Sequence, residues 1–157
     1  MNYKGKIFLL EDEKKFQDDI SNELEKLNYA FDMHDGERII KSQTPRQISY
    51  KPTRPIDIII KYPYNLAILD MEVKEDLQGG LTLLRDIRKY NQTIPIIMTS
   101  EYISQKRTEE ALSLVIYDLI LKRPSFDLGR LTRKVDEIVM HKTEKLIFQE
   151  KIRKLFK

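Results

Sequence analysis

Short apolar segments recur along the chain, and their hydrophobic pattern predicts β-strands. Four of them are continuous runs, at residues 7–10, 66–69, 94–98 and 119–121. Each run is too short for a helix, and uninterrupted apolar character is typical of strands covered on both faces, as in a parallel sheet. A fifth segment, residues 29–33, alternates between apolar and polar positions, which predicts an edge strand with one face nearer to water.

Helical patterns lie between these runs. Apolar residues repeat every three or four positions in residues 14–27, 80–90 and 105–115, and a long final helix is predicted from about residue 126 onward. Strands that alternate with helices predict right-handed crossovers and a doubly wound sheet. The sequence therefore predicts an α/β fold, with helices on both faces of a parallel sheet.

Residues 41–62 interrupt this alternation. They contain Pro45, Pro52 and Pro55, and each proline disfavours helical geometry in the residue before it. We therefore expect an inserted surface loop, followed by the short apolar segment 56–60. The β-branched content of that segment favours a strand, whereas its place in the chain favours a helix, and the sequence leaves both open.

Charged and hydroxyl side chains follow the continuous apolar runs directly. In chain order they are Glu11, Asp12, Asp70, Thr99, Ser100 and Lys122. The carboxyl ends of parallel strands share one edge of the sheet, and ligands bind at that edge in open α/β folds. We therefore expect three carboxylates, one or two hydroxyls and one ammonium group to converge in a single crevice.

The three carboxylates of this predicted cluster need a counter-ion. Two carboxylates about 4 Å apart repel by roughly 4 kcal/mol at an effective dielectric of about 20. Mg²⁺ binds such sites through one or two carboxylates, waters and phosphate oxygens, so we predict Mg²⁺ at Glu11, Asp12 and Asp70. One Asp70 oxygen is then left to attack phosphorus, and Lys122 neutralises charge on the transferred group. The Ser100 hydroxyl can bind one oxygen of that group.

Five segments carry these residues: 6–13 (KIFLLEDE), 66–70 (LAILD), 80–88 (GLTLLRDIR), 95–100 (PIIMTS) and 119–122 (LILK). Together they resemble the receiver domains of bacterial two-component response regulators. The resemblance implies a flavodoxin-like (βα)5 fold with a five-stranded parallel sheet, and essential Mg²⁺. It also implies a sensor histidine kinase or a phosphotransfer protein as phosphodonor, and a downstream protein target. In this family, Ser100 falls at the switch hydroxyl, and Glu72 falls where a backbone carbonyl binds the metal.

The chain departs from that family at several positions. Glu11 stands where the family commonly has aspartate, and Leu119 stands in place of the aromatic switch residue. Arg123 separates Lys122 from the proline that usually follows it, and the bulky residues 114–116 replace a glycine before the last strand. These departures concern the switching path rather than the phosphoacceptor.

Composition limits the remaining classes of protein. A chain of 157 residues, 41% hydrophobic and 34% charged, fits one domain with its own core. It has no cysteine, which excludes disulfides and thiolate metal sites, and no apolar run near the roughly 18–20 residues of a membrane span. A formal charge of +3 does not by itself indicate nucleic-acid binding. We expect a cytoplasmic protein that contacts neither a membrane nor, within this chain, nucleic acid.

The predicted final helix is longer than its sheet requires. A helix over residues 126–155 spans about 45 Å, whereas a five-residue strand spans about 17 Å. We therefore divide the chain into a receiver domain, residues 1–140, with the insertion at about 41–62, and a C-terminal helical extension, residues 141–157. Apolar residues of the extension favour a homodimer contact through the helix. A linker toward an output domain and a helix that folds back are the alternatives.

Each site residue also has an ordinary explanation by itself. Acids after a strand stabilise the first turn of the next helix, and Ser100 can cap the helix that follows it. These explanations do not account for convergence at one edge, so we favour a regulatory phosphoacceptor over an enzyme. One alternative is a degenerate, non-phosphorylated receiver that acts as an interaction module. A less favoured one is a phosphohydrolase of the haloacid-dehalogenase type, which would need an aspartate in place of Glu72.

Overall fold

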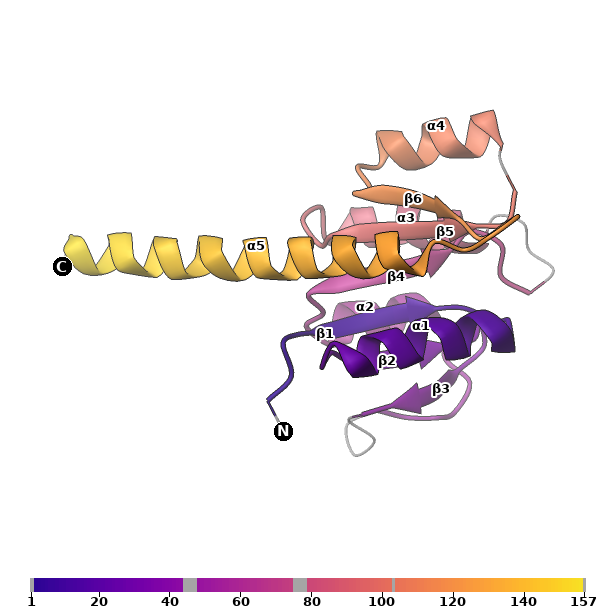
Figure 1. Ribbon diagram of the computed structural model, residues 1–157, viewed down its shortest axis with the longest axis horizontal. Coiled ribbons are helices and arrows are strands. Elements are labelled where there is room, and N and C mark those ends of the chain that lie inside the picture. Colours follow the sequence, from indigo (N-terminus) through magenta and orange to yellow (C-terminus); the bar gives the residue numbers. More distant parts are fainter. Residues whose placement is uncertain (1, 44–47, 75–78, 103, 157) are drawn as a thin grey trace.

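The computed structural model describes residues 2–43, 48–74, 79–102 and 104–156, which form an α/β fold (Figure 1). The strands are β1 (Lys6–Leu10), β2 (Ala30–His34), β3 (Ile39–Ser42), β4 (Leu66–Asp70), β5 (Ile96–Ser100) and β6 (Asp118–Leu121). The helices are α1 (Lys14–Lys26), α2 (Pro55–Lys61), α3 (Gly79–Tyr90), α4 (Gln105–Ser113) and α5 (Leu128–Leu155).

The strands form one sheet in the order β3-β2-β1-β4-β5-β6. Neighbouring strands are parallel, except that β2 and β3 are antiparallel. The predicted fold class is therefore confirmed, with one strand more than the five expected. The chain leaves β1 toward β2 on one side and reaches β4 on the other, so the strand order reverses between β1 and β4. In doubly wound sheets a crevice opens at this point, outside the carboxyl ends of the strands.

Strand β2, expected at the edge of the sheet, lies one position inside it because β3 pairs with its outer side. All five residues of β2 are buried. Its polar residue Asp32 accepts hydrogen bonds from the Ser42 hydroxyl at 2.5 Å and the Tyr64 hydroxyl at 2.6 Å, and the Lys6 ammonium lies 3.0 Å from it. The alternation of β2 thus marks a buried polar network and not a wetter face.

The apolar segment 56–60 belongs to helix α2, which settles the choice between strand and helix. Pro55 stands in the first turn, where its missing N–H costs nothing. Ile56, Ile58 and Ile59 pack into the core. The loop before the helix is held by His34, whose Nε2 lies 2.8 Å from the Thr53 carbonyl oxygen.

The helices cover both faces of the sheet (Figure 1). Helices α1 and α5 share one core cluster with the sheet, to which they contribute Ile20, Leu24, Leu131, Val135, Ile138 and Val139. Helices α2, α3 and α4 cover the opposite face and contribute Ile56, Ile58, Ile59, Leu81, Leu83, Leu84, Ile87 and Ala111. Helix α5 continues far beyond the sheet (Figure 1), which confirms the predicted overhang.

The turn before β6 has an unusual backbone. Val115 has φ +59°, a left-handed conformation that is strongly disfavoured for β-branched residues. The Arg88 guanidinium donates hydrogen bonds to the carbonyl oxygens of Leu114, Val115 and Ile94, each at 2.8 Å. The bonds to Leu114 and Val115 hold this turn, which contains the bulky residues 114–116 instead of a glycine.

Candidate functional site

Asp70 is the last residue of β4 and is only 1% exposed. Helix α3 begins directly against it: the Gly80 N–H donates to the Met71 carbonyl at 3.0 Å. A Cβ atom on Gly80 would lie 1.9 Å from the carbonyl oxygen of Asp70, closer than any van der Waals contact allows. Gly80 is therefore required for the close approach of α3 to the end of β4.

Lys122, the residue after β6, brings its ammonium between two buried carboxylates. Its Nζ atom lies 3.0 Å from Oε2 of Glu11 and 3.0 Å from Oδ2 of Asp70. The Phe16 ring of α1 packs against the same ammonium, with its centroid 4.4 Å from Nζ, a favourable cation–π distance. Two carboxyl groups and one ammonium group are thus almost completely buried together, and full ionisation of both carboxyl groups would leave one negative charge in excess.

The protonation of this cluster follows from its enclosure. Burial, followed by the charge of Glu11, raises the pKa of Asp70 to about 9, although Lys122 acts in the opposite direction. Burial also raises the pKa of Glu11. Burial alone would lower the pKa of Lys122, but the two carboxylates outweigh it and raise that pKa. The lysine therefore stays charged, and a second cation would bring both carboxylates to their ionised form.

Glu11, Asp12 and Asp70 form an acidic set that could hold a metal ion. One carboxylate oxygen of each lies within 4.8 Å of the others. Asp12 accepts a hydrogen bond from the Lys74 N–H at 2.7 Å, and Asp70 Oδ2 is buried with the Lys122 ammonium at 3.0 Å. Clustered carboxylate oxygens of this kind are the donor set that a hard divalent cation such as Mg²⁺ selects.

The two other predicted site residues contact each other. Ser100 is buried at the end of β5, and its Oγ lies 2.6 Å from Oε1 of Glu72. The Glu72 side chain is thus directed at the hydroxyl. The predicted contribution of Glu72 to the metal concerns its backbone carbonyl, and it stays a prediction.

Sequence reasoning did not find several residues around the site. Phe16 lies within the helical pattern of residues 14–27, and nothing in that pattern indicates a contact with Lys122. At the rim, the Glu101 carboxylate raises the pKa of Glu13 to about 7 by hydrogen bonding, and Arg123 Nε lies 3.4 Å from Glu101 Oε2. These contacts join segments that are far apart in sequence, so no local motif predicts them.

Comparison with protein families decides the classification. The family model of the response regulator receiver domain matches residues 7–136. The chain belongs to this family. Receiver domains are generally regulatory units rather than classical enzymes, and they interact with histidine kinases or phosphotransfer proteins.

Solved receiver domains share the fold of this receiver domain at low sequence identity. A CheY-like receiver domain protein from Methanospirillum hungatei superimposes with a TM-score of 0.69 at 18% identity, over 90% of this chain and 98% of that one. The receiver domain of a Francisella response regulator superimposes with a TM-score of 0.66 at 21% identity, over 88% of this chain and 98% of that one. A two-component response regulator from Clostridium difficile superimposes with a TM-score of 0.66 at 20% identity, over 87% of this chain and 96% of that one.

Two further findings concern curated sequences and membrane spans. A search of curated protein sequences finds no significant match to this receiver domain. Among the described residues, no helix combines the length and the apolar character needed to cross a membrane.

Proposed function

We propose that this receiver domain accepts a phosphoryl group on Asp70 from a phosphohistidine of a sensor histidine kinase or phosphotransfer protein, in a Mg²⁺-dependent reaction. The observation that carries the proposal is the enclosed charge cluster, in which Lys122 Nζ lies 3.0 Å from both Asp70 and Glu11. Asp70 stands at the carboxyl end of β4, where the strand order reverses between β1 and β4, so a nucleophilic carboxylate is present at the crevice edge of the sheet.

In the proposed reaction, an oxygen of the ionised Asp70 attacks the phosphorus of the phosphohistidine. A P–O bond forms and the P–N bond breaks, its electron pair remaining on the imidazole nitrogen, which takes up a proton. The Lys122 ammonium keeps its proton and neutralises charge on the transferred group. Glu11 holds the ammonium in place through its contact at 3.0 Å.

Glu11, Asp12 and Asp70 are the residues that would hold Mg²⁺ in this proposal, and the oxygen set described above fits that ion. When bound, Mg²⁺ supplies positive charge that favours ionised Asp70 and stabilises phosphoryl oxygens. In the same proposal, the backbone carbonyl of Glu72 is a further ligand that would bind Mg²⁺. Within the chain, we assign the receiver unit to residues 1–140, and signalling to regulated contacts with a downstream protein.

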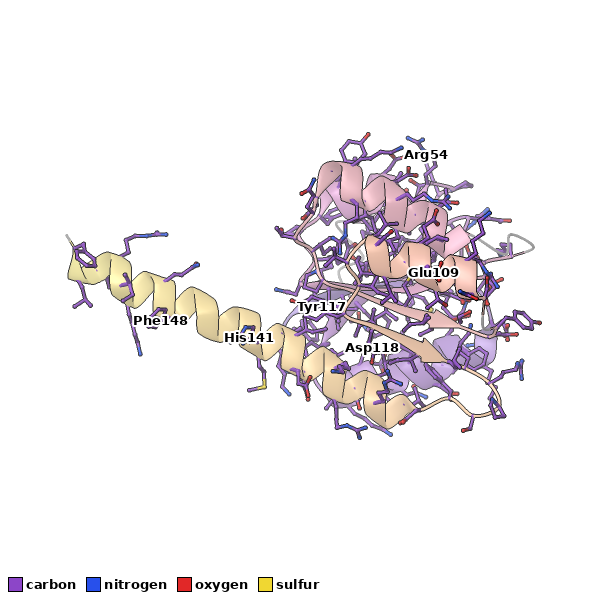
Figure 2. The ribbon with its side chains drawn as sticks, turned by 90° about the horizontal axis from the view of Figure 1, so that it is seen from above. Arg54, Glu109, Tyr117, Asp118, His141 and Phe148 are labelled. Carbon is purple, nitrogen blue, oxygen red and sulfur yellow. The ribbon has the colours of Figure 1, made fainter. Side chains whose placement is uncertain are left out.

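The C-terminal extension, residues 141–157, is proposed to pair with a second copy of the chain. Figure 2 shows Phe148 on the part of α5 that projects away from the sheet. Phe148 is 64% exposed and Leu155 is 76% exposed, and together with Ile152 they repeat at spacings of four and three residues along one helical stripe. Deleting residues 141–157 should therefore weaken self-association in sedimentation velocity. A full-length protein that is monomeric at high concentration, with and without phosphodonor, would contradict the pairing.

The phosphoacceptor proposal is tested by incubating the full chain with acetyl phosphate and Mg²⁺ and measuring its intact mass. We expect one phosphoryl group per chain, lost when Mg²⁺ is chelated and absent in Asp70→Asn. Absence of the adduct in the unaltered protein would favour an interaction module that is not phosphorylated. Rapid turnover of unrelated phosphate esters would instead favour a phosphohydrolase.

A further inference from the structure

Glu72 places one carboxylate oxygen among three hydrogen-bond donors at the end of β5. Its Oε1 atom lies 2.6 Å from the Ser100 hydroxyl and 3.2 Å from each of the backbone nitrogens of Glu101 and Tyr102. We call these three donors the anion cradle. The Ser100 hydroxyl also lies 2.8 Å from the Tyr102 carbonyl oxygen, but its single proton favours the charged acceptor.

The anion cradle lies next to the acceptor strand. Asp70 pairs with Thr99, the residue before Ser100, in the register of β4 and β5. The backbone N–H of Glu72 donates to Oδ1 of Asp70 at 3.3 Å, so Glu72 contacts the acceptor with its backbone and the cradle with its side chain. After burial and Glu11, the charge of Glu72 also contributes to raising the pKa of Asp70.

The cradle has the chemistry of an oxyanion site. A hydroxyl and two backbone N–H groups that converge on one oxygen stabilise a localised negative charge. A phosphoryl group carries about −1.5 to −2 charges and three acceptor oxygens, so it suits the same donors as a carboxylate does. The two anions cannot share the donors, because like charges at this distance repel strongly.

The second carboxylate oxygen of Glu72 makes it easier for the Glu72 side chain to leave the anion cradle. Its Oε2 atom is buried and has no hydrogen-bond partner among the described residues, so half of the carboxylate lacks the solvation that it would have in water. Moving outward would restore that solvation, which offsets part of the loss of the three hydrogen bonds.

We propose that the Glu72 carboxylate occupies, in the unphosphorylated protein, the place that a phosphoryl oxygen takes once Asp70 is phosphorylated. Glu72 is then a resident competitor that must be displaced from Ser100 and the neighbouring N–H groups before the phosphoryl group is fully bound. This inference rests on the proposed function of Asp70, and it assigns to Glu72 control over how readily the site accepts an anion.

A purely structural role for Glu72 would give different results. If its side chain only organised the loop after β5, then Glu72→Gln, which keeps an acceptor oxygen for the same donors, would leave anion binding unchanged, and Glu72→Ala would weaken it. If Glu72 is a competitor, both variants should strengthen anion binding, because both remove the competing charge.

The test is a titration of the full chain with beryllofluoride, a phosphoryl analogue, in the presence of Mg²⁺, followed by the backbone amide NMR signals of Glu101 and Tyr102. We expect Glu72→Gln and Glu72→Ala to bind beryllofluoride about tenfold more tightly than the unaltered protein, since one charge-assisted hydrogen bond corresponds to roughly that factor. The matched control is Glu109→Gln, which removes the same charge from an exposed position on α4 (Figure 2) and should leave the affinity unchanged.

The outcomes separate the two proposals. Unchanged or weaker binding in both Glu72 variants, with a normal adduct on Asp70, overturns the competitor role alone. Binding by the variants and not by the unaltered protein supports it strongly. If neither the unaltered protein nor any variant binds beryllofluoride or accepts a phosphoryl group from acetyl phosphate, while all unfold cooperatively in urea, then the phosphoacceptor proposal fails and the role of Glu72 fails with it.

Discussion

Two buried aspartates on the same sheet, Asp32 and Asp70, are held in opposite ways. Asp32 is 0% exposed and its carboxylate is fully engaged by the Ser42 and Tyr64 hydroxyls and by the Lys6 ammonium. Asp70 is equally enclosed, but its carboxylate has only one backbone hydrogen bond, at 3.3 Å to Oδ1, and the Lys122 ammonium at 3.0 Å from Oδ2 among the described residues. It also shares its lysine with a second carboxylate, that of Glu11.

The difference separates a structural carboxylate from a reactive one. Buried charges are tolerated when hydrogen bonds and a cation replace their lost solvation, as at Asp32. That network ties β2 to Ser42 on one side of the inserted region and to Tyr64 on the other. At Asp70 the same compensation is incomplete, so the free energy of the site falls when a cation or an electrophile arrives. Incomplete compensation is typical of functional sites.

The largest expected effect comes from removing the cation of each cluster. Lys122→Met leaves Glu11 and Asp70 enclosed without a counter-charge, which should lower the free energy of unfolding by about 3–5 kcal/mol at pH 8. Lys6→Met is the matched control, because Asp32 keeps two hydroxyl donors, and it should cost about 1–2 kcal/mol. Urea unfolding without divalent ions measures the loss of stability in both variants. Equal losses in Lys122→Met and Lys6→Met would contradict the difference between the two clusters.

Replacing the structural carboxylate should be the next largest effect. Asp32→Ala leaves the Tyr64 hydroxyl and the Lys6 ammonium without their shared buried acceptor, and we expect a loss of about 2–4 kcal/mol. The loss should be independent of Mg²⁺, since the network lies apart from the acidic set. A Mg²⁺-dependent loss in the same urea experiment would show that the two clusters are coupled.

Replacing the reactive carboxylate should have the opposite sign. Buried Asp70 is mostly protonated at pH 8 in the folded protein, which costs free energy relative to the ionised group of the unfolded chain. Asp70→Asn removes that cost and leaves Glu11 paired with Lys122, so the Mg²⁺-free protein should gain roughly 1–3 kcal/mol at pH 8. A loss of stability, measured by urea unfolding in a chelator, would mean that Asp70 is a structural carboxylate like Asp32.

The gain should depend on pH in a defined direction. The pKa of Asp70 is raised to about 9 in the folded protein by burial first and by Glu11 second, against about 3.9 when unfolded. Between these values the folded state binds more protons. The stability that Asp70 contributes is therefore fully present below about pH 4 and is lost as the pH rises toward 9. Without Mg²⁺, the unaltered protein should lose stability from pH 5 to pH 8 more steeply than Asp70→Asn.

Much of the fold and of the site could be predicted because both depend on simple periodicity. Continuous apolar runs indicate buried parallel strands, and parallel strands bring their carboxyl ends to one edge. The residues that follow the runs therefore had to converge, and Glu11, Asp70 and Lys122 do so. The helical pattern after residue 126 likewise predicted that α5 is longer than the sheet.

Other features depend on side-chain directions and close approaches that one sequence does not encode locally. The polar position in β2 suggested a wet face, but Asp32 is buried because β3 supplies Ser42 and the chain before β4 supplies Tyr64. Glycine is needed at position 80 because a Cβ atom there would lie 1.9 Å from the Asp70 carbonyl oxygen, an approach that depends on how α3 packs and not on the local sequence. The contact between Glu72 and Ser100 joins the loop after β4 to the end of β5, and no spacing rule predicts it.

The most direct test of the central claim asks which of the two buried aspartates becomes phosphorylated. The full chain is treated with acetyl phosphate and Mg²⁺, the acyl phosphate is trapped by borohydride reduction, and the modified residue is located by peptide mass spectrometry. The account predicts modification at Asp70 and none at Asp32. Modification at Asp32 or at another carboxylate, with Asp70 intact, would contradict it.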